Sequence, residues 1–465
     1  MSEETPSEAS ETPSADPSSD DASGPPAPSE PVAAGGAESP APPAPKKRLT
    51  RRRLLGLAAL GGLAYGTRKL FWIDAPQRLD DTVLAESGAK LLEQAWAGID
   101  PKLVLDTHVH LVGLGAGGTG CRVHPGATSL TSPVRFLRTR FYKGASGIYD
   151  DARADALYVE RLVDLFSHHR GRGLLLAFDE HYSEAGQVVD AHTEFHTPND
   201  YVFRIVAEHP ELFVPCASVH PYRPDALDEL SRVAERGAVA VKWLPNAMGM
   251  DPLSERCQAF YERMAALKLV LITHAGEEQA VEAEEAQELG NPLRLRRPLD
   301  AGVRVVVAHC ASLGKNYDLD APQDTSGKQP RRSAYRLFRR LAEEPRAKGL
   351  LYGDVSAMTQ FNRSGGPLLE TLRDEELHGR LVNGSDYPLP GIDPLIRTGL
   401  LVKQGYLSAE ERVGLNALFE WNPVAFDFAV KRCLRAPTPA GAHDPAGKQL
   451  PASVFEALRA FPRLT

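Results

Sequence analysis

The chain has 465 residues with a formal net charge of −8 at pH 7, and 25% of its residues are charged. This length exceeds what a single hydrophobic core usually needs, so we expect some segments to lie outside the globular part. No basic stripe with interleaved aromatic residues is present, which argues against a nucleic-acid partner. The five cysteines form no CxxC pair, so neither a zinc ribbon nor a disulfide framework is predicted.

The amino-terminal segment, residues 1–49, consists mainly of Pro, Ser, Ala and acidic residues. Its first 45 residues contain no Lys or Arg and hardly a large apolar side chain. Such a composition cannot bury enough apolar surface to offset the entropy of ordering. We therefore expect a disordered acidic tail.

Residues 50–72 place a basic block before a mildly apolar stretch, with a second basic pair after it. The apolar stretch is too short for a hydrocarbon core ~30 Å thick, which takes ~20 residues. Thr50-Arg51-Arg52-Arg53-Leu54-Leu55 resembles the twin-arginine export motif. This resemblance implies recognition by the twin-arginine export machinery and a location in the periplasm or cell envelope. The alternative is an uncleaved signal that anchors the chain in the inner membrane through residues 54–66.

A helical lead-in is expected over 73–100, a barrel domain over 101–430, and a C-terminal extension over 431–465. In the central part, short apolar or β-branched runs alternate with helical stretches such as Ala152–His168 and Glu255–Leu267. This alternation predicts parallel strands that are buried on both faces. Eight strands are predicted: Leu103–Leu111, Gly173–Asp179, Phe213–Pro221, Val239–Pro245, Leu269–Ala275, Val303–Cys310, Leu350–Met358 and Leu381–Tyr387.

Eight strand-helix units predict a (β/α)₈ TIM barrel of the α/β class, with enlarged loops after strands 1 and 6. These loops run from Val112 to Asp151 and from Ala311 to Pro330, and would overhang the carboxyl-terminal mouth. The competing architecture is a doubly wound open sheet. The glycine-rich run that begins at Gly113 has no helix behind it, so no phosphate-binding loop is predicted there.

Ionisable residues interrupt the apolar runs at or near the predicted strand ends. His108 and His110 are two apart in strand 1, so both imidazoles are expected to point into one space. The other interruptions come from strands 4, 5, 6 and 8: Lys242, His274, His309 and Asp386. Imidazole nitrogen and carboxylate oxygen are ligands of Zn²⁺ and related divalent ions, which lower the pKa of water toward ~7. The set predicts a divalent metal centre, most simply zinc, at the barrel mouth.

The segments DTHVHL, VKWLPN, THAGE, AHCAS and NGSDYPL resemble the signature of the amidohydrolase superfamily, in particular its amidohydrolase 2 group. The resemblance extends from Leu103 to Pro423. It implies a metal-dependent hydrolase in which the ion is held by four residues: His108, His110, His274 and Asp386. It also implies that His309 polarises the substrate or shuttles a proton, and that Asp386 accepts a proton from the attacking water.

Lys242 has two interpretations. In superfamily members with two metals, a strand-4 lysine is carboxylated and bridges the ions, with His309 among the ligands of the second. The alternative is an ammonium group that pairs with Asp386 or anchors an anionic substrate. The resemblance slightly favours a single ion.

Other polar residues near strand ends are candidates for supporting roles. Asp106 and Thr107 are expected to orient the histidine pair. Further candidates for the pocket wall are Asp179, His181, His220, Trp243, Asn246, Glu277, Glu278 and Tyr387. The pair His168-His169 is expected at the surface.

The predicted activity is hydrolysis of an amide, ester, lactone or related C–N or C–O bond of a small molecule by metal-activated water. A decarboxylase of the same superfamily, acting on a carboxylic acid, is the leading alternative. A non-catalytic envelope scaffold is the third possibility. An oligomer is an open alternative to a monomer.

Overall fold

The computed structural model describes residues 73–393 and 395–465. The predicted acidic tail and export signal lie outside these residues, so both remain predictions. Within the described ranges, none of the helices combines the length and the apolarity that a membrane span requires.

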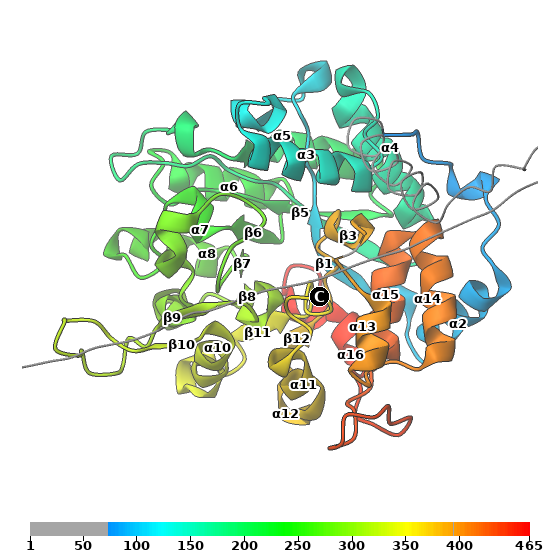
Figure 1. Ribbon diagram of the computed structural model, residues 1–465. Coiled ribbons are helices and arrows are strands. Elements are labelled where there is room, and N and C mark those ends of the chain that lie inside the picture. Colours follow the sequence, from blue (N-terminus) through cyan, green and yellow to red (C-terminus); the bar gives the residue numbers. More distant parts are fainter. Residues whose placement is uncertain (1–72, 394) are drawn as a thin grey trace, which may run out of the picture. The chain divides into compact units, whose positions relative to one another are not determined.

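Eight parallel strands form the central sheet, and their spatial order follows their order in the sequence (Figure 1). They are β1 (Leu105–His110), β3 (Arg172–Leu176), β5 (Phe213–Ala217), β6 (Ala240–Trp243), β7 (Val270–Thr273), β8 (Val305–Val307), β11 (Leu351–Asp354) and β12 (Leu381–Val382). All eight predicted strands are found, each shorter than expected.

The sheet closes where its first and last strands meet. The Thr107 N–H donates to the Asn383 carbonyl at 2.9 Å, and the His110 N–H donates to the Tyr387 carbonyl at 3.1 Å. Val109 and Tyr387 also form a parallel bridge. The prediction of a (β/α)₈ TIM barrel is therefore confirmed.

Helices surround the strands (Figure 1). They are α2 (Glu86–Trp96), α3 (Pro133–Ala145), α4 (Ala154–Ser167), α5 (Asn199–Glu208), α6 (Ala226–Glu235), α7 (Pro245–Met248), α8 (Gln258–Ala266), α9 (Arg296–Asp300), α10 (Ala334–Glu343), α11 (Gly366–Arg373), α12 (Glu375–His378), α13 (Thr398–Lys403), α14 (Ala409–Trp421), α15 (Pro423–Cys433) and α16 (Ala452–Phe455). The two predicted helices correspond to α4 and α8.

The enlarged loops carry secondary structure of their own. The loop after β1 contains α3 and β2 (Arg122–Val123), which pairs with β4 (Phe195–His196). The loop after β8 forms a hairpin of β9 (Lys315–Tyr317) and β10 (Arg331–Ser333).

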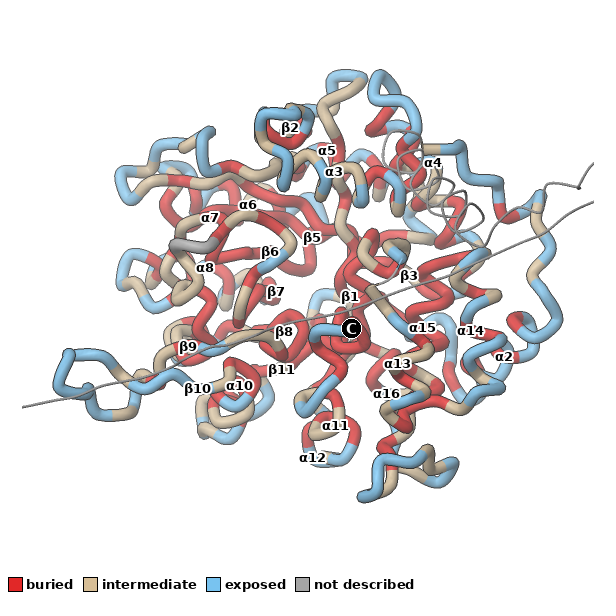
Figure 2. Tube along the Cα trace, in the orientation of Figure 1, coloured by how far each residue is buried: buried red, intermediate tan, exposed pale blue. Residues whose placement is uncertain are grey.

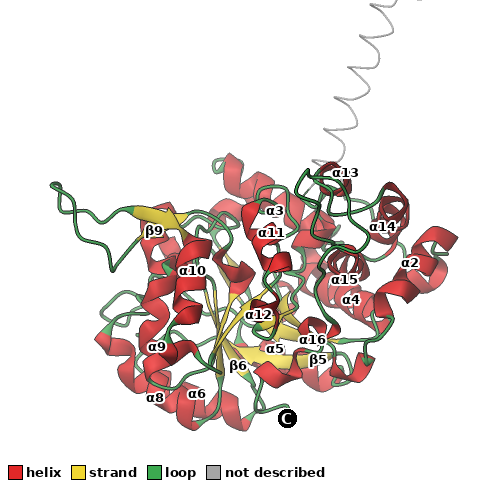
Figure 3. Cartoon of the chain, turned by 90° about the horizontal axis from the view of Figure 1, so that it is seen from below, coloured by secondary structure: helices red, strands yellow, loops and turns green. Residues whose placement is uncertain are grey.

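The strands are buried, whereas the outer helices and loops present exposed faces (Figure 2). Runs of β-branched residues such as Val305–Val307 are fully buried, as parallel strands covered on both faces require. The C-terminal segment completes the core, because Ala457, Ala460 and Phe461 pack against Leu105 and other strand residues. The C-terminal segment lies below the strands (Figure 3) and covers that end of the barrel. A site is therefore expected at the opposite end, the carboxyl-terminal mouth.

His169 corrects the expectation that the His168-His169 pair lies at the surface. Helix α4 ends at Ser167, and the His169 side chain turns inward until only 1% of it is exposed. Its ring packs against Trp96 and Phe428, with centroids 5.5 Å and 5.4 Å away. Periodicity could not reveal this burial, because the partners come from distant helices.

Candidate metal centre

The predicted site residues line one cavity at the carboxyl-terminal mouth, with a volume of about 430 Å³. Two lie in β1, one lies in β6, and the others follow β7, β8 and β12: His108, His110, Lys242, His274, His309 and Asp386. The closing of the barrel explains the convergence, because the carboxyl ends of parallel strands meet at one rim.

His108, His110 and Asp386 form the tightest group. The Nε2 atoms of His110 and His108 lie 3.2 Å and 3.4 Å from Oδ1 of Asp386. One ligand atom from each of the three residues lies within 4.8 Å of the other two. Two imidazole nitrogens and a carboxylate oxygen thus face a common point, as in a catalytic site for a first-row divalent ion.

Asp354, at the end of β11, sets the orientation of His108. Its Oδ2 accepts from Nδ1 of His108 at 2.9 Å, and neither side chain is more than 2% exposed. With the hydrogen on Nδ1, the lone pair of His108 is on Nε2, the nitrogen that faces Asp386. Carboxylates that fix a ligand's tautomer in this way are typical of metal sites.

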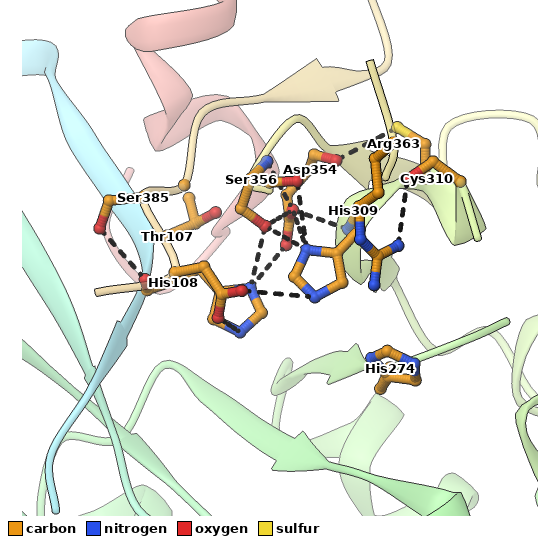
Figure 4. Close-up of polar contacts among 12 residues, drawn as sticks. Thr107, His108, His274, His309, Cys310, Asp354, Ser356, Arg363 and Ser385 are labelled. Carbon is orange, nitrogen blue, oxygen red and sulfur yellow. Dashed lines mark hydrogen bonds and ion pairs between the residues drawn. The ribbon is translucent and has the colours of Figure 1, made fainter. Parts of the chain in front are cut away.

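The same carboxylate reaches His309 through Ser356. The Ser356 hydroxyl bonds to Oδ1 of Asp354, and therefore accepts from Nδ1 of His309, which lies 2.7 Å from it. The Ser356 carbonyl, 3.2 Å from the same nitrogen, can only accept as well. His309 therefore carries its hydrogen on Nδ1 and presents the lone pair of Nε2 toward Asp386, 3.7 Å away. Figure 4 shows this cluster.

Strand-end residues adopt unusual backbone conformations at two of these positions. His309 has φ 56° and Asp386 has φ 63°, in the left-handed region that costs a non-glycine residue about 1–3 kcal/mol. Two hydrogen bonds hold these conformations: the His309 N–H donates to Oδ1 of Asp354 at 2.8 Å, and the Asp386 N–H donates to the His108 carbonyl at 2.8 Å. The strain turns both side chains into the cavity.

His274 is arranged as a ligand without a partner. Its Nδ1 lies 3.3 Å from Oε2 of Glu278, whereas its Nε2 is buried with no hydrogen-bond partner among the described residues. Burial lowers the pKa of His274 to about 4, so the ring is neutral at physiological pH. Its ring centroid lies 5.5 Å from that of His309, but His274 is not among the residues whose ligand atoms lie within 4.8 Å of one another. The structure therefore places a buried, neutral and unsatisfied imidazole near the candidate centre, outside its tightest group.

Lys242 contacts one member of the group directly: its Nζ is 2.9 Å from Nε2 of His108. Burial lowers the pKa of Lys242, although the charges of Asp354 and Asp386 oppose this shift. The Lys242 side chain contacts His108, whereas one of the alternatives left open by the sequence had paired it with Asp386. Its carboxylation remains a prediction.

Asp386 is ionised in this environment. Burial alone would raise its pKa, but interaction with the neighbouring imidazoles of His108, His309 and His110 holds the pKa well below its usual range. The carboxylate can therefore serve as a ligand or accept a proton at neutral pH.

Asp106 and Thr107 support the backbone rather than the imidazole rings. Oδ1 of Asp106 accepts from the N–H groups of His108 and Ser385, at 3.1 Å and 2.7 Å. The Thr107 hydroxyl donates to the Asn383 carbonyl at 2.9 Å. Both residues join β1 to the segment that carries Asp386.

Of the remaining candidates for the pocket wall, all of which lie in the described part of the chain, Glu278 is the one that lines the cavity. Asp179 accepts from the His220 N–H at 2.8 Å and pairs with Arg223 at 3.1 Å. His220 itself bonds the Met248 carbonyl. These groups stabilise loops outside the cavity.

Sequence reasoning missed Asp354, Ser356 and Arg363. Asp354 and Ser356 occur within the predicted seventh strand, so the rule that identified Lys242 could have found the carboxylate. Arg363 follows in the next loop, where sequence alone gives no signal of burial.

Comparison with known proteins identifies a family. Residues 105–413 match the family model described as Amidohydrolase. None of the curated proteins matches the chain.

Several solved structures are similar to this chain. An uncharacterized TIM-barrel protein from Bordetella bronchiseptica is 14% identical, with 67% of this chain and 94% of that chain covered and a TM-score of 0.42. For 5-carboxyvanillate decarboxylase from Sphingomonas paucimobilis, the identity is 14%, the coverages are 78% and 99%, and the TM-score is 0.43. 4-Oxalomesaconate hydratase from Rhodopseudomonas palustris is 14% identical, with 78% of this chain and 96% of that chain covered and a TM-score of 0.39.

Proposed function

The chain belongs to the amidohydrolase family of enzymes, and from this premise we propose that it is a metal-dependent hydrolase of a small molecule. The bond attacked would be an amide, ester, lactone or related C–N or C–O bond. The proposal depends chiefly on one observation: His108, His110 and Asp386 face a common point in the wall of a cavity large enough for such a substrate.

Members of the superfamily bind divalent metal, and the donor set in this chain suits zinc. We assign His108, His110, His274 and Asp386 as the residues that would hold one cation. When bound, a divalent cation supplies Lewis acidity, which makes water a nucleophile near neutral pH. The alternative, a carboxylated Lys242 between two ions with His309 as a ligand, predicts two equivalents of metal per chain.

Proton transfer is assigned to Asp386 and His309. Asp386, ionised and buried, would accept the proton that the attacking water loses. His309 is neutral, because burial lowers its pKa well below the usual range, and its Nε2 lone pair faces the same carboxylate. His309 can therefore take this proton onward or bond a substrate oxygen after protonation.

Isotope labelling separates hydrolysis from decarboxylation. The purified zinc-loaded protein would be assayed on amides, esters and lactones, and on aromatic and enoic carboxylic acids, in ¹⁸O-water. The proposal expects ¹⁸O in the product acid, and a loss of about 10²-fold or more in Asp386→Asn, as for loss of a general base. Release of CO₂ without ¹⁸O incorporation would establish the decarboxylase instead. Retention of activity after removal of metal would contradict both.

We further propose export of the folded enzyme to the cell envelope through residues 50–72. The test is fractionation of a bacterial host that expresses the full chain, either unchanged or with Arg51→Lys and Arg52→Lys together. Loss of the envelope fraction in the double variant supports the twin-arginine route. An unchanged distribution contradicts it.

A further inference from the structure

Helix α3, in the enlarged loop after β1, carries an exposed apolar face. Four large apolar side chains of this segment are exposed: Leu130 at 72%, Val134 at 61%, Leu137 at 37% and Phe141 at 54%. Their spacing of three and four residues places them on one side of the helix and of the turn that precedes it. Single exposed apolar residues need no explanation, but four of them at helical spacing indicate an interaction surface. We call these four residues the apolar stripe.

The other side of α3 is held by the loops around the barrel. Arg135 pairs with Glu194 at 2.7 Å and with Glu282 at 2.6 Å. The Tyr142 hydroxyl donates to the Ala280 carbonyl at 2.8 Å. These contacts fix the orientation of the helix, so the exposure of the apolar stripe follows from the fold.

The apolar stripe borders the mouth of the cavity. Phe141 is exposed and also lines the cavity, and so does Phe361 from the loop after β11. The exposed Arg397 lies over the Phe361 ring, with its Cζ 4.5 Å from the ring centroid. Figure 3 shows α3 at the end of the barrel opposite the C-terminus. The exposed apolar surface therefore belongs to the face that surrounds the entrance to the candidate site.

The charges that α3 itself places beside the apolar stripe are positive. Four residues of the helix are basic and none is acidic. Arg138 follows Val134 by four residues, which places it next to the stripe on one side. Arg140 follows Leu137 by three residues and lies next to the stripe on the other side. An arginine thus flanks each edge of the apolar stripe.

This combination fits a lipid surface that carries negative charge. Apolar side chains of such a helix enter the boundary between headgroups and acyl chains, while the flanking arginines extend to the anionic headgroups. A second copy of the chain fits less well. Two α3 helices face to face would bring their arginines together, with no acidic residue in either helix to pair them.

We propose that the apolar stripe of α3 docks on the surface of an anionic phospholipid bilayer, with Arg138 and Arg140 at the headgroups. Phe361 and Arg397 extend this surface across the mouth, so the cavity opens toward the lipid. Docking through α3 is independent of the reaction at the metal centre. It is also independent of residues 50–72, because α3 lies outside that segment.

A fluorescent reporter on the apolar stripe tests docking locally. All five native cysteines are buried, so Leu137→Cys can be labelled selectively with an environment-sensitive dye in the full chain. With vesicles of phosphatidylglycerol and phosphatidylcholine, we expect a blue shift and a rise in emission of about twofold or more. Vesicles of phosphatidylcholine alone should give a much smaller response, and salt should weaken the response to the anionic vesicles.

Leu227→Cys, labelled in the same way, is the matched control. Leu227 is also 37% exposed, but it lies on α6, whose first turn is acidic. Its reporter should not respond to either kind of vesicle.

Vesicle flotation measures how much the apolar stripe adds to the affinity of the full chain. Val134→Ser together with Leu137→Ser should weaken binding to the anionic vesicles by about tenfold or more, because each side chain would otherwise leave water. The matched control combines Val413→Ser with Leu227→Ser, which are 60% and 37% exposed on other helices, and should bind like the wild type. Any affinity that residues 50–72 supply is common to all of these variants.

Three results would overturn the proposal: an unchanged reporter at position 137, equal responses at positions 137 and 227, or equal responses to vesicles with and without phosphatidylglycerol. A response at position 137 that rises with protein concentration in the absence of vesicles would also overturn it, and would assign the surface to a second copy of the chain.

Discussion

Replacement of Asp354 by Asn should weaken metal binding without removing any proposed ligand. Oδ2 of Asp354 accepts from His108, while its Oδ1 accepts from Ser356 and from the His309 N–H. An amide has one oxygen, so its NH₂ group must face one of these sets of donors. If it faces His108, the ring must move its hydrogen to Nε2, the nitrogen that should bind the ion.

The size of the effect follows from the bond that is lost. A hydrogen bond to a charged group contributes about 1.5–3 kcal/mol, which corresponds to about 10- to 150-fold in affinity. Loss of such a supporting carboxylate at metal sites generally costs about 10- to 100-fold. We therefore expect the zinc affinity of Asp354→Asn to fall by about 10- to 100-fold, measured by competition with a chromophoric chelator.

Asp155→Asn provides the control for this measurement. Asp155 is also fully buried, but it accepts from the N–H groups of Leu114 and Gly115 and from the Thr119 hydroxyl, and contacts no histidine. Its replacement should lower stability and leave zinc affinity within about threefold, since independent sites couple weakly. If Asp354→Asn bound zinc as tightly as Asp155→Asn, the proposed control of the His108 tautomer would be refuted.

Two further variants test packing and charge. In Gly384→Ala, the added Cβ would lie 2.7 Å from Cβ of His108, so we expect the His108 ring to be displaced. Zinc binding, measured by the same titration, should then be at least about tenfold weaker. Gly379→Ala is the control, because its added Cβ meets open space, and it should bind zinc normally. Burial lowers the pKa of His169 from 6.5 to about 4, because the folded protein favours the neutral ring. The contribution of this neutral ring to the free energy of unfolding is therefore fully present above pH 6.5. It falls by about 3 kcal/mol as the pH is lowered to 4. Between pH 7 and pH 4, His169→Met should therefore lose about 3 kcal/mol less stability than the wild type in unfolding titrations. His168→Met, the control, should behave like the wild type. An equal pH dependence of stability in His169→Met and the wild type would contradict this reasoning.

The fold could be predicted because its signals are local. Eight apolar, β-branched runs at regular spacing specify buried parallel strands, and the barrel brings their ends together. His108 and His110 share a face of β1 for the same reason, since side chains two apart on a strand point the same way. The convergence of the site residues therefore followed from strand position alone.

The remaining features depend on contacts between distant segments. The position of Asp354 in a strand could be predicted, but its hydrogen bonds to His108 and to the His309 N–H join segments far apart in the sequence, which no local pattern indicates. The same holds for the burial of Arg363 and His169, and for the packing of Phe461 against the strands. Local patterns identify which residues can do chemistry, whereas tertiary contacts decide which of them are oriented to do it.

The central claim is that distant side chains bind a divalent cation at the barrel mouth. Mass-spectrometric metal analysis of purified protein, unchanged and with His108→Ala, tests this claim most directly. We predict one equivalent of zinc in the wild type, and its loss in a variant that keeps the wild-type circular dichroism spectrum. A folded wild type that takes up no divalent metal, or a variant that retains the full equivalent, would contradict the account.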